Sequence, residues 1–216
     1  MFELGYLPQE VRPANGQERA RLETVLTKLR SLRRDRVIPR DVKVLTSWNG
    51  LALASLTAAA RFDPRYRKEA DALFAFVRAR LWDGRRLVKG VSGGKAHGVA
   101  ELEDYAYLAY GVSRYAALSG GADARRFLHT LLEAGWKRFH DGKDCRMEDA
   151  SMLASDHADP WKDGPTPAPA ALLAGVTLAA GGPGLDKRGG KVLEAARAAA
   201  TGFPLWRATL ANPQPW

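Results

Sequence analysis

Three short polar clusters, about sixty residues apart, each open an apolar segment with helical spacing. They occupy residues 46–50 (TSWNG), 101–105 (ELEDY) and 163–167 (DGPTP), and the segments that follow read LALASLTAAAR, AYLAYGVSRYAAL and APAALLAGVTLAA. A second, more charged helical segment follows each of these. A repeat of this period is typical of stacked helical hairpins, because one hairpin cannot bury its own apolar face. Equivalent positions face the same way, so we expect the three clusters on one rim of the assembly.

Two Asp-Gly pairs mark the end of the second helix in the first two units. They are Asp83-Gly84 in LWDGRRL and Asp141-Gly142 in RFHDGKD. An Asp-Gly pair between short apolar segments is typical of a β-hairpin turn. The equivalent positions of the two pairs are the strongest internal sign that the units repeat.

Apolar spacing and the turn residues between segments predict the remaining elements. They are an irregular lead-in over about residues 1–16, a leading helix over 17–34 and an extended link over 42–45. Three pairs of helices follow, over about residues 46–62 with 66–82, 102–118 with 123–139, and 167–180 with 190–201. Thr46 or Ser47 is the expected N-cap of the first unit. Thr166 and Pro167 are the expected N-cap and first residue of the third.

Small, apolar helices that alternate with amphipathic ones indicate an inner and an outer layer. The sequence therefore predicts an all-α fold, a partial (α/α) toroid of about three helical hairpins with short β-hairpin turns, in which residues 17–216 form a single domain. A straight solenoid is the competing arrangement. The Asp-Gly turns and the long polar connection over residues 146–163 favour the toroid.

Composition argues against several classes of protein. No apolar run approaches the ~20 residues that span a bilayer, and the N-terminus has no secretion signal, so we expect a cytoplasmic protein with no membrane contact. The single cysteine, Cys145, excludes an internal disulfide, and we interpret it as incidental rather than catalytic.

The net charge of +9 suggests an anionic partner, but most of it lies in one segment. Residues 12–43 carry ten Lys or Arg against four Asp or Glu, or +6 of the total. The basic run at residues 30–40 could contact phosphates. We prefer a solvated helix end, because no aromatic residues alternate with the basic ones. Nucleic acid is not expected as a partner.

Several blocks of the sequence resemble the C-terminal region of the thioredoxin-domain-containing, spermatogenesis-associated protein family. They are VLTSWNGLALASLTAAAR, LEDYAYLAYGVSRYAALSG and the DGPTP segment, and KLRSLRRDRVIPRDVKVLTSWNG also fits. The resemblance covers about residues 17–203. It implies a six-hairpin (α/α) region similar to N-acylglucosamine 2-epimerases and six-hairpin glycosidases. It also implies that this chain is truncated, without the thioredoxin-like domain and the first hairpins of that family.

The chain departs from the pattern of that family at two places. The family's Asp-Asp-Lys before the Ser-Trp-Asn block reads Asp41-Val42-Lys43 here. Its Asp-Gly-x-x-Pro-Ser-x-Asn segment reads DGPTPAPA over residues 163–170, without the Ser and the Asn. Two polar positions expected to face the cavity are therefore apolar, which argues against inherited catalysis.

Trp48 and Asn49 open the first inner helix and are candidate ligand-binding residues. An indole face beside an amide suits a sugar ring, by stacking on its C–H face and by hydrogen bonds to its hydroxyls. The competing interpretation is structural. Trp48 would then wedge between hairpins while Asn49 helps to cap the helix.

Candidate acid–base residues are Glu103, Asp104 and Tyr105 at the start of the second inner helix, and Asp163 before the third. A helix N-terminus stabilises a carboxylate anion, which suits a base. Glycoside hydrolysis needs two carboxylates, one with a raised pKa, and Glu103 and Asp163 could meet across the rim. Tyr105 would bind the ligand. The alternative is helix-start charges beside a buried tyrosine.

Epimerase-like proton abstraction and return would use histidine. His97 and His157 are the candidates, because both lie on loops before inner helices, at the expected rim. His129 and His140 lie on an outer helix and are interpreted as surface or packing residues. No metal site is predicted, since the DHAD segment at residues 156–159 has no second cluster of ligands, and no cofactor is expected.

Two functions remain open. The first is a non-catalytic or partner-dependent module that binds a protein partner or a small ligand on its cavity rim. The second is part of a sugar-modifying enzyme, similar to an epimerase or a glycosidase. Half a toroid leaves the flanks of inner helices exposed, and large exposed apolar patches mark interfaces. We therefore prefer the first, with a second copy or another polypeptide completing the toroid and a sugar-like molecule as the candidate ligand.

Overall fold

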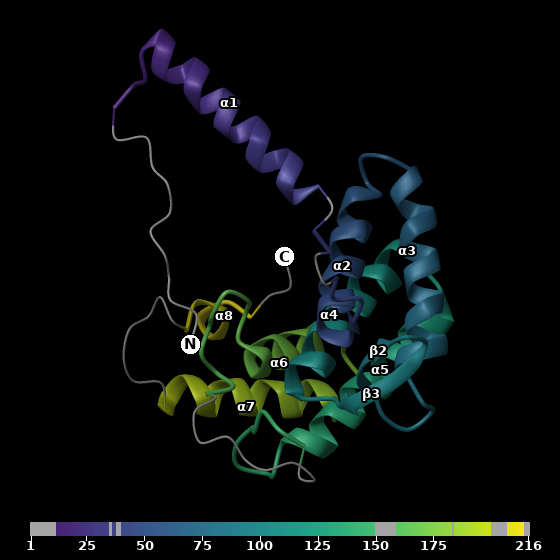
Figure 1. The fold of residues 1–216 in the computed structure, drawn as a ribbon. Helices are drawn as coiled ribbons and strands as arrows, with labels where there is room; N and C mark the ends of the chain where they lie inside the picture. The colour runs from purple at the N-terminus through teal and green to yellow at the C-terminus, as the bar shows by residue number, and fades with distance from the viewer. Residues whose placement is uncertain are drawn as a thin grey trace. The chain divides into compact units, whose positions relative to one another are not determined.

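The computed structural model describes residues 12–34, 36–37, 40–149, 159–182, 184–199 and 207–213. The chain divides into two units, Met1–Asp41 and Val42–Trp216, which we describe separately. The elements are α1 (Gly16–Arg33), β1 (Val44–Leu45), α2 (Thr46–Ala59), α3 (Arg65–Phe76), the π-helical turn η1 (Val77–Leu81), β2 (Val88–Ser92), β3 (Lys95–Val99), α4 (Leu102–Ser119), α5 (Ala122–Phe139), α6 (Pro169–Ala180), α7 (Leu185–Ala199) and α8 (Ala208–Ala211) (Figure 1).

Most of the described first unit is α1, whose start is fixed by a reciprocal cap. The Asn15 side chain accepts a hydrogen bond from the Glu18 N–H at 2.9 Å, and the Glu18 carboxylate accepts one from the Asn15 N–H at 3.0 Å. Such a pair satisfies N–H groups that the first helical turn leaves without partners. The leading helix predicted from the sequence is confirmed, and residues 1–11 of the expected lead-in lie outside the described residues.

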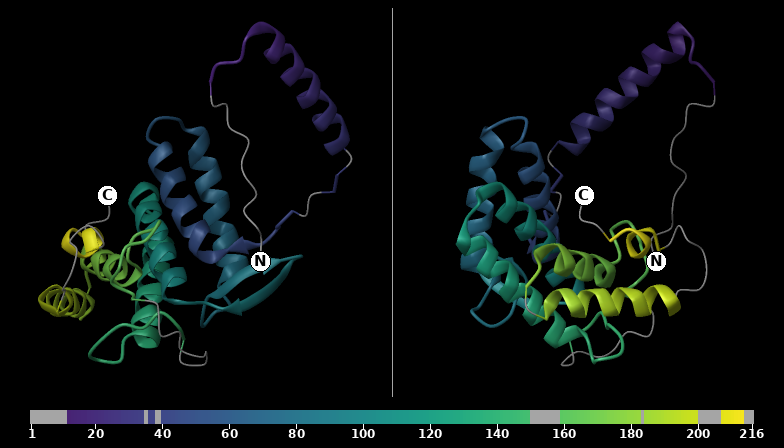
Figure 2. Two further views of the ribbon diagram at one scale, coloured as in Figure 1. Left: turned by 60° about the vertical axis from the view of Figure 1, so that its left-hand side comes forward. Right: turned by 180° about the vertical axis from the view of Figure 1, so that it is seen from behind.

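Three helical hairpins form most of the described part of the second unit. The first helices of the hairpins pack in a row, α2 against α4 and α4 against α6. Each also packs against its own partner, in the pairs α2 with α3, α4 with α5 and α6 with α7. Figures 1 and 2 show this arrangement from three sides. The predicted helical class is confirmed, whereas closure into a toroid stays a prediction.

Glycines bring the backbones of α2 and α4 into contact. A Cβ on Gly50 would lie 2.4 Å from the carbonyl carbon of Tyr107, and one on Gly111 would lie 2.2 Å from the Gly50 carbonyl oxygen. No side chain fits at either position. The small residues of the first inner helix therefore serve close helix packing, as expected.

The two Asp-Gly pairs form the same turn. In each, the backbone N–H of the Asp donates to the carbonyl three residues later, at 3.1 Å for Asp83 and 3.2 Å for Asp141. The Oδ1 atom of each Asp accepts two further backbone N–H groups. Gly84 and Gly142 have φ angles of +97° and +101°, which favour glycine. The equivalence of the two turns predicted from the sequence is confirmed.

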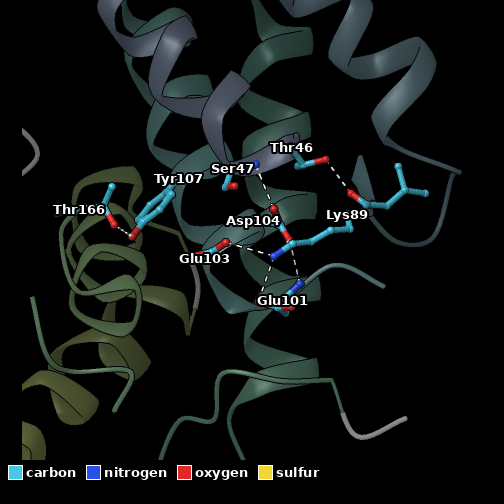
Figure 3. A network of polar contacts seen from close by, with 9 residues as sticks. Thr46, Ser47, Lys89, Glu101, Glu103, Asp104, Tyr107 and Thr166 are labelled. Carbon is cyan, nitrogen blue, oxygen red and sulfur yellow. Dashed lines mark hydrogen bonds and ion pairs between the residues drawn. The ribbon is translucent and has the colours of Figure 1, made fainter. Parts of the chain in front are cut away.

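A three-stranded antiparallel sheet, in the order β1-β2-β3, lies before α4. Leu45 of β1 pairs with Gly90 of β2, and Gly90 pairs with His97 of β3. The sequence predicted only an extended link and a short hairpin turn in this region. The sheet positions Lys89 of β2 toward the first turn of α4 (Figure 3).

The third hairpin differs from its predicted boundaries. Its first helix starts at Pro169 rather than at Pro167, because the Asp163 carboxylate accepts the N–H of Ala168 at 2.7 Å and holds the preceding residues in a loop. α7 begins at Leu185, five residues before the predicted start. The same Asp163 also accepts the N–H of Thr209 at 2.9 Å, which anchors α8 beside the hairpin.

Candidate functional site

Four charged side chains meet where β2 faces the start of α4, and we call them the charged cluster: Lys89, Glu101, Glu103 and Asp104. The Lys89 Nζ atom lies 3.0 Å from Glu101 Oε2, 3.1 Å from Glu103 Oε1 and 3.5 Å from Asp104 Oδ2 (Figure 3). Three carboxylates thus share one ammonium group. The cluster carries an excess of negative charge when all four groups are ionised.

Asp104 is the buried member of the cluster, with no exposed side-chain surface. Its Oδ1 atom accepts the N–H of Ser47 at 3.0 Å, and its Oδ2 atom accepts the N–H of Glu101 at 2.9 Å. Burial raises the pKa of Asp104 to about 6, although Lys89 and the two N–H groups oppose the rise. Desolvation therefore dominates over pairing at this carboxylate.

Lys89 holds the cluster together. Burial on its own would lower the pKa of Lys89, but the charges of Asp104, Glu101 and Glu103 raise it above its ordinary value. The ammonium group therefore stays protonated at neutral pH. Since the Glu103 side chain keeps 31% of its surface exposed, it is the member with the most access to solvent.

Tyr107 lies one turn further along α4 and points away from Lys89, toward the loop before α6 (Figure 3). Its hydroxyl group lies 2.8 Å from both Thr166 Oγ1 and the Pro167 carbonyl oxygen. Burial raises the pKa of Tyr107 to about 12, so the hydroxyl stays protonated and donates. The helix that follows the second polar cluster is thus joined to the third polar cluster through this side chain.

Trp48 and Asn49 behave differently from each other. The Trp48 side chain is 69% exposed although it lies on an inner helix. The Asn49 side-chain amide donates to the Leu45 carbonyl oxygen at 2.7 Å, so it supports the start of α2. Trp48 is therefore accessible to a ligand or a partner. The N-cap of α2 is Leu45 and no side chain caps this helix, so the predicted N-cap at Thr46 or Ser47 and the predicted capping role of Asn49 are both corrected.

Tyr105 and Asp163 are structural residues. Tyr105 is 1% exposed, its ring packs on Phe139, and its hydroxyl oxygen accepts the N–H of Leu87 at 3.0 Å. The expectation that Tyr105 contacts a ligand is corrected, because the side chain lies in the core. Both oxygens of Asp163 accept backbone N–H groups, from Ala168 and Thr209. Glu103 contacts Lys89 instead, and no described interaction joins it to Asp163.

Of the two candidate histidines, the described residues include His97 alone. His97 lies on β3, above Gly90, and its Nε2 atom is buried without a hydrogen-bond partner in the described part of the chain. His157 lies outside the described residues. Over those residues, no group of three or more His, Cys, Asp or Glu could hold a metal ion. Burial raises the pKa of the Cys145 thiol to about 12, so it is a poor nucleophile.

The residue that sequence reasoning missed is Lys89. It lies on a strand between Leu87 and Val91, which are both buried, so period-two alternation places it on the inward face. A lysine at an inward position signals a buried carboxylate partner, because an unpaired ammonium group is costly to bury. The segment LVKGV at residues 87–91 contains this signal, but it can be recognised only once the segment has been assigned as a strand.

Comparison with known proteins adds no identification. No protein-family model matches the chain, and no curated protein matches it. Within the described segments, every helix is too short or too polar to span a bilayer.

Proposed function

We propose that this chain is a non-catalytic helical module that binds a protein partner through the exposed flank of α2, and that the partner is a helix of a second copy or of another polypeptide. The observation that carries this proposal is a stripe of exposed small and aromatic residues on an inner helix. We call Trp48, Ala52, Ser55 and Phe62 the α2 stripe.

The α2 stripe lies opposite the face that packs on α4. Trp48, Ala52 and Ser55 follow the spacing i, i+4, i+7 and are exposed, and Phe62, just after the helix, is 91% exposed. The buried residues of α2 are Thr46, Ser47, Gly50, Leu53, Ala54 and Thr57. Small side chains between two large aromatic ones suit the close approach of another helix, and aromatic residues often dominate binding energy.

The row of inner helices supports the same proposal. α4 has a neighbour on each side, α2 and α6, whereas the α2 stripe is exposed. In a closed (α/α) toroid each inner helix has two such neighbours, so the stripe is where a further hairpin would pack. The resemblance of the sequence to a family with a six-hairpin region agrees with this arrangement.

The contacts of the carboxylates support a non-catalytic role. Asp104 and Asp163 each use both oxygens to accept backbone N–H groups. A general acid or base must instead reach the proton that it transfers. These two side chains therefore have a structural role, since they join separate segments of the chain by hydrogen bonds.

Native mass spectrometry of the purified chain, with and without extract from its source, tests the proposal. We expect a homodimer or a complex with one other polypeptide, and we expect Ala52→Arg with Ser55→Arg to abolish it. Thr130→Arg, at an exposed position on the outer helix α5, is the matched control and should leave the complex intact. A chain that stays monomeric and retains no polypeptide contradicts the proposal.

A second candidate is part of a sugar-modifying enzyme, and the charged cluster favours it. The raised pKa of Asp104 keeps this carboxyl group partly protonated near pH 6, beside the partly exposed Glu103. Turnover of a free sugar by the purified chain or its complex, lost in Glu103→Gln and kept in Glu133→Gln, would establish this function.

A further inference from the structure

A cavity of about 450 Å³ lies between the second Asp-Gly turn and α7, and its lining is basic. His140 and Lys143 line it from the turn, and Lys187, Arg188 and Lys191 line it from α7. None of the residues that line it is acidic. The volume falls within the range of cavities that hold small molecules, which is about 300–1,000 Å³.

The basic side chains come together through local geometry. Lys187 and Lys191 are four residues apart on α7, and Arg188 and Lys191 are three apart, so the three lie on one face of the helix. For Lys143, Arg188 and Lys191, the described residues provide no ion pair. An anion entering the cavity would therefore meet several cationic groups at once.

The nearby carboxylates are directed at other groups. Asp141 accepts the backbone N–H groups of Lys143 and Asp144, at 2.8 Å and 2.9 Å. Asp144 accepts the Trp161 indole N–H at 2.9 Å and the backbone N–H of Cys145 at 2.7 Å. The Oδ1 atom of each aspartate is thus engaged by N–H groups, and no described ion pair joins either carboxylate to the lysines.

His140 presents a donor on the same side. Its Nδ1 atom accepts the N–H of Gly142 at 3.2 Å, so the proton of the neutral ring lies on Nε2. Burial lowers the pKa of His140, the neighbouring Arg188 adds to this effect, and Asp141 and Asp144 oppose it. The neutral ring therefore offers a directed hydrogen bond in addition to the charges.

A second cavity of about 410 Å³ adjoins the first and shares Lys143, Val192 and Ala195 with it. This second cavity reaches the edge of Trp161 and the apolar residue Ala196. Asp144, Asp159 and Arg207 also line this second cavity, so the combined space has a basic end and an end of mixed charge. It can hold a molecule with an anionic group and a polar body.

We propose that these joined cavities bind a phosphate-bearing small molecule, with its phosphate on Lys143, Arg188, Lys191 and His140. Several converging cationic donors match the charge and the acceptor oxygens of phosphate, and hydrogen bonds between charged groups are stronger than neutral ones. This proposal is independent of the proposed function, because none of these residues belongs to the α2 stripe or to the charged cluster.

Calorimetric titration of the whole chain with inorganic pyrophosphate tests the proposal. We expect saturable binding that weakens by at least about tenfold in the double variant Arg188→Ala with Lys191→Ala. The matched control is Arg85→Ala with Lys137→Ala, which removes the same charge from another basic cavity of about 380 Å³. We expect that control to change the affinity by less than about twofold.

Nuclear magnetic resonance of the His140 ring locates the bound anion without using activity. Pyrophosphate should shift the ring signals of His140 and leave those of His129 unchanged. The proposal would be overturned by a lack of saturable binding, by equal weakening in both double variants, or by a His140 signal that does not move. Tighter binding of a single-stranded oligonucleotide, lost in the same variant, would overturn it in favour of a nucleic-acid site.

Discussion

The Asp104 carboxylate accepts the backbone N–H of Ser47 at 3.0 Å across a separation of 57 residues, and so it ties the start of α2 to the start of α4. Its other oxygen accepts the N–H of Glu101, and Lys89 lies 3.5 Å away. One buried side chain thus joins two hairpins and a strand.

Replacing Asp104 by Ala should destabilise the fold strongly. The change leaves the N–H groups of Ser47 and Glu101 without their acceptor, and each buried unsatisfied group costs about 1–3 kcal/mol. We expect the free energy of unfolding to fall by about 2–4 kcal/mol in urea denaturation. Asp123→Ala is the control, because Asp123 is exposed and pairs with Arg78, and it should cost less than about 1 kcal/mol.

The stability of the protein should depend on pH through Asp104. Its pKa is about 6 in the folded chain against 3.8 ordinarily, so the folded state binds the proton more tightly. The contribution of this proton to stability is complete below pH ~4 and is lost as the pH rises through ~6. Relative to Asp104→Asn, which cannot titrate, the wild-type chain should lose about 1–3 kcal/mol between pH 4 and pH 7.5. Urea denaturation at both pH values measures this difference, and a constant difference would contradict the raised pKa.

The contact between α2 and α4 should not tolerate a methyl group. Gly111→Ala places a Cβ 2.2 Å from the Gly50 carbonyl oxygen, so the two helices must separate. We expect a loss of about 2–4 kcal/mol in the free energy of unfolding. Gly135→Ala, also in a helix, meets its nearest atoms at 3.5 Å and should be neutral or stabilising. Similar losses in both variants would argue against the close approach.

Thr177 should contribute to the stability of the fold through the hydrogen bonds of its hydroxyl group rather than through the shape of its side chain. Its Oγ1 atom accepts the Trp136 indole N–H at 2.8 Å and donates to the Leu173 carbonyl at 2.7 Å. Thr177→Val leaves the buried indole N–H without a partner and should cost about 1–3 kcal/mol. Thr57→Val is the control, since among the described residues the buried Thr57 hydroxyl contacts only the Leu53 carbonyl, to which it donates. Thermal unfolding of the two variants compares them, and equal shifts would contradict the role of the indole.

Periodicity predicted most of the helical fold, because turn and helix-breaking residues mark the ends of the helices in each repeated unit. The Asp63-Pro64 break, the Gly120-Gly121 break and both Asp-Gly turns lie where the sequence places them. Each is a local signal that depends on backbone preferences of a few residues. The start of α6 was missed, since it depends on Asp163, whose carboxylate accepts the N–H of Ala168 five residues further along the chain.

The candidate site could be predicted only in part, since its key contacts join residues far apart in sequence. Glu103 and Asp104 were identified from their place at a helix start, and both belong to the charged cluster. Lys89 comes from a strand that the sequence did not predict, and the burial of Tyr105 depends on packing against α5. Contacts of this kind depend on the tertiary structure, and a local sequence motif carries no information about them.

The two hydrogen bonds that Asp163 accepts impose an order on folding during synthesis. One oxygen holds Ala168, immediately before α6, and the other holds Thr209, which the ribosome adds 46 residues after Asp163 itself. The first two hairpins can therefore mature while the chain is still being translated. The third hairpin gains its bond to Thr209 only after that residue has been added. A ribosome that stalls before Thr209 would therefore expose to chaperones a nascent chain in which α6 lacks this contact.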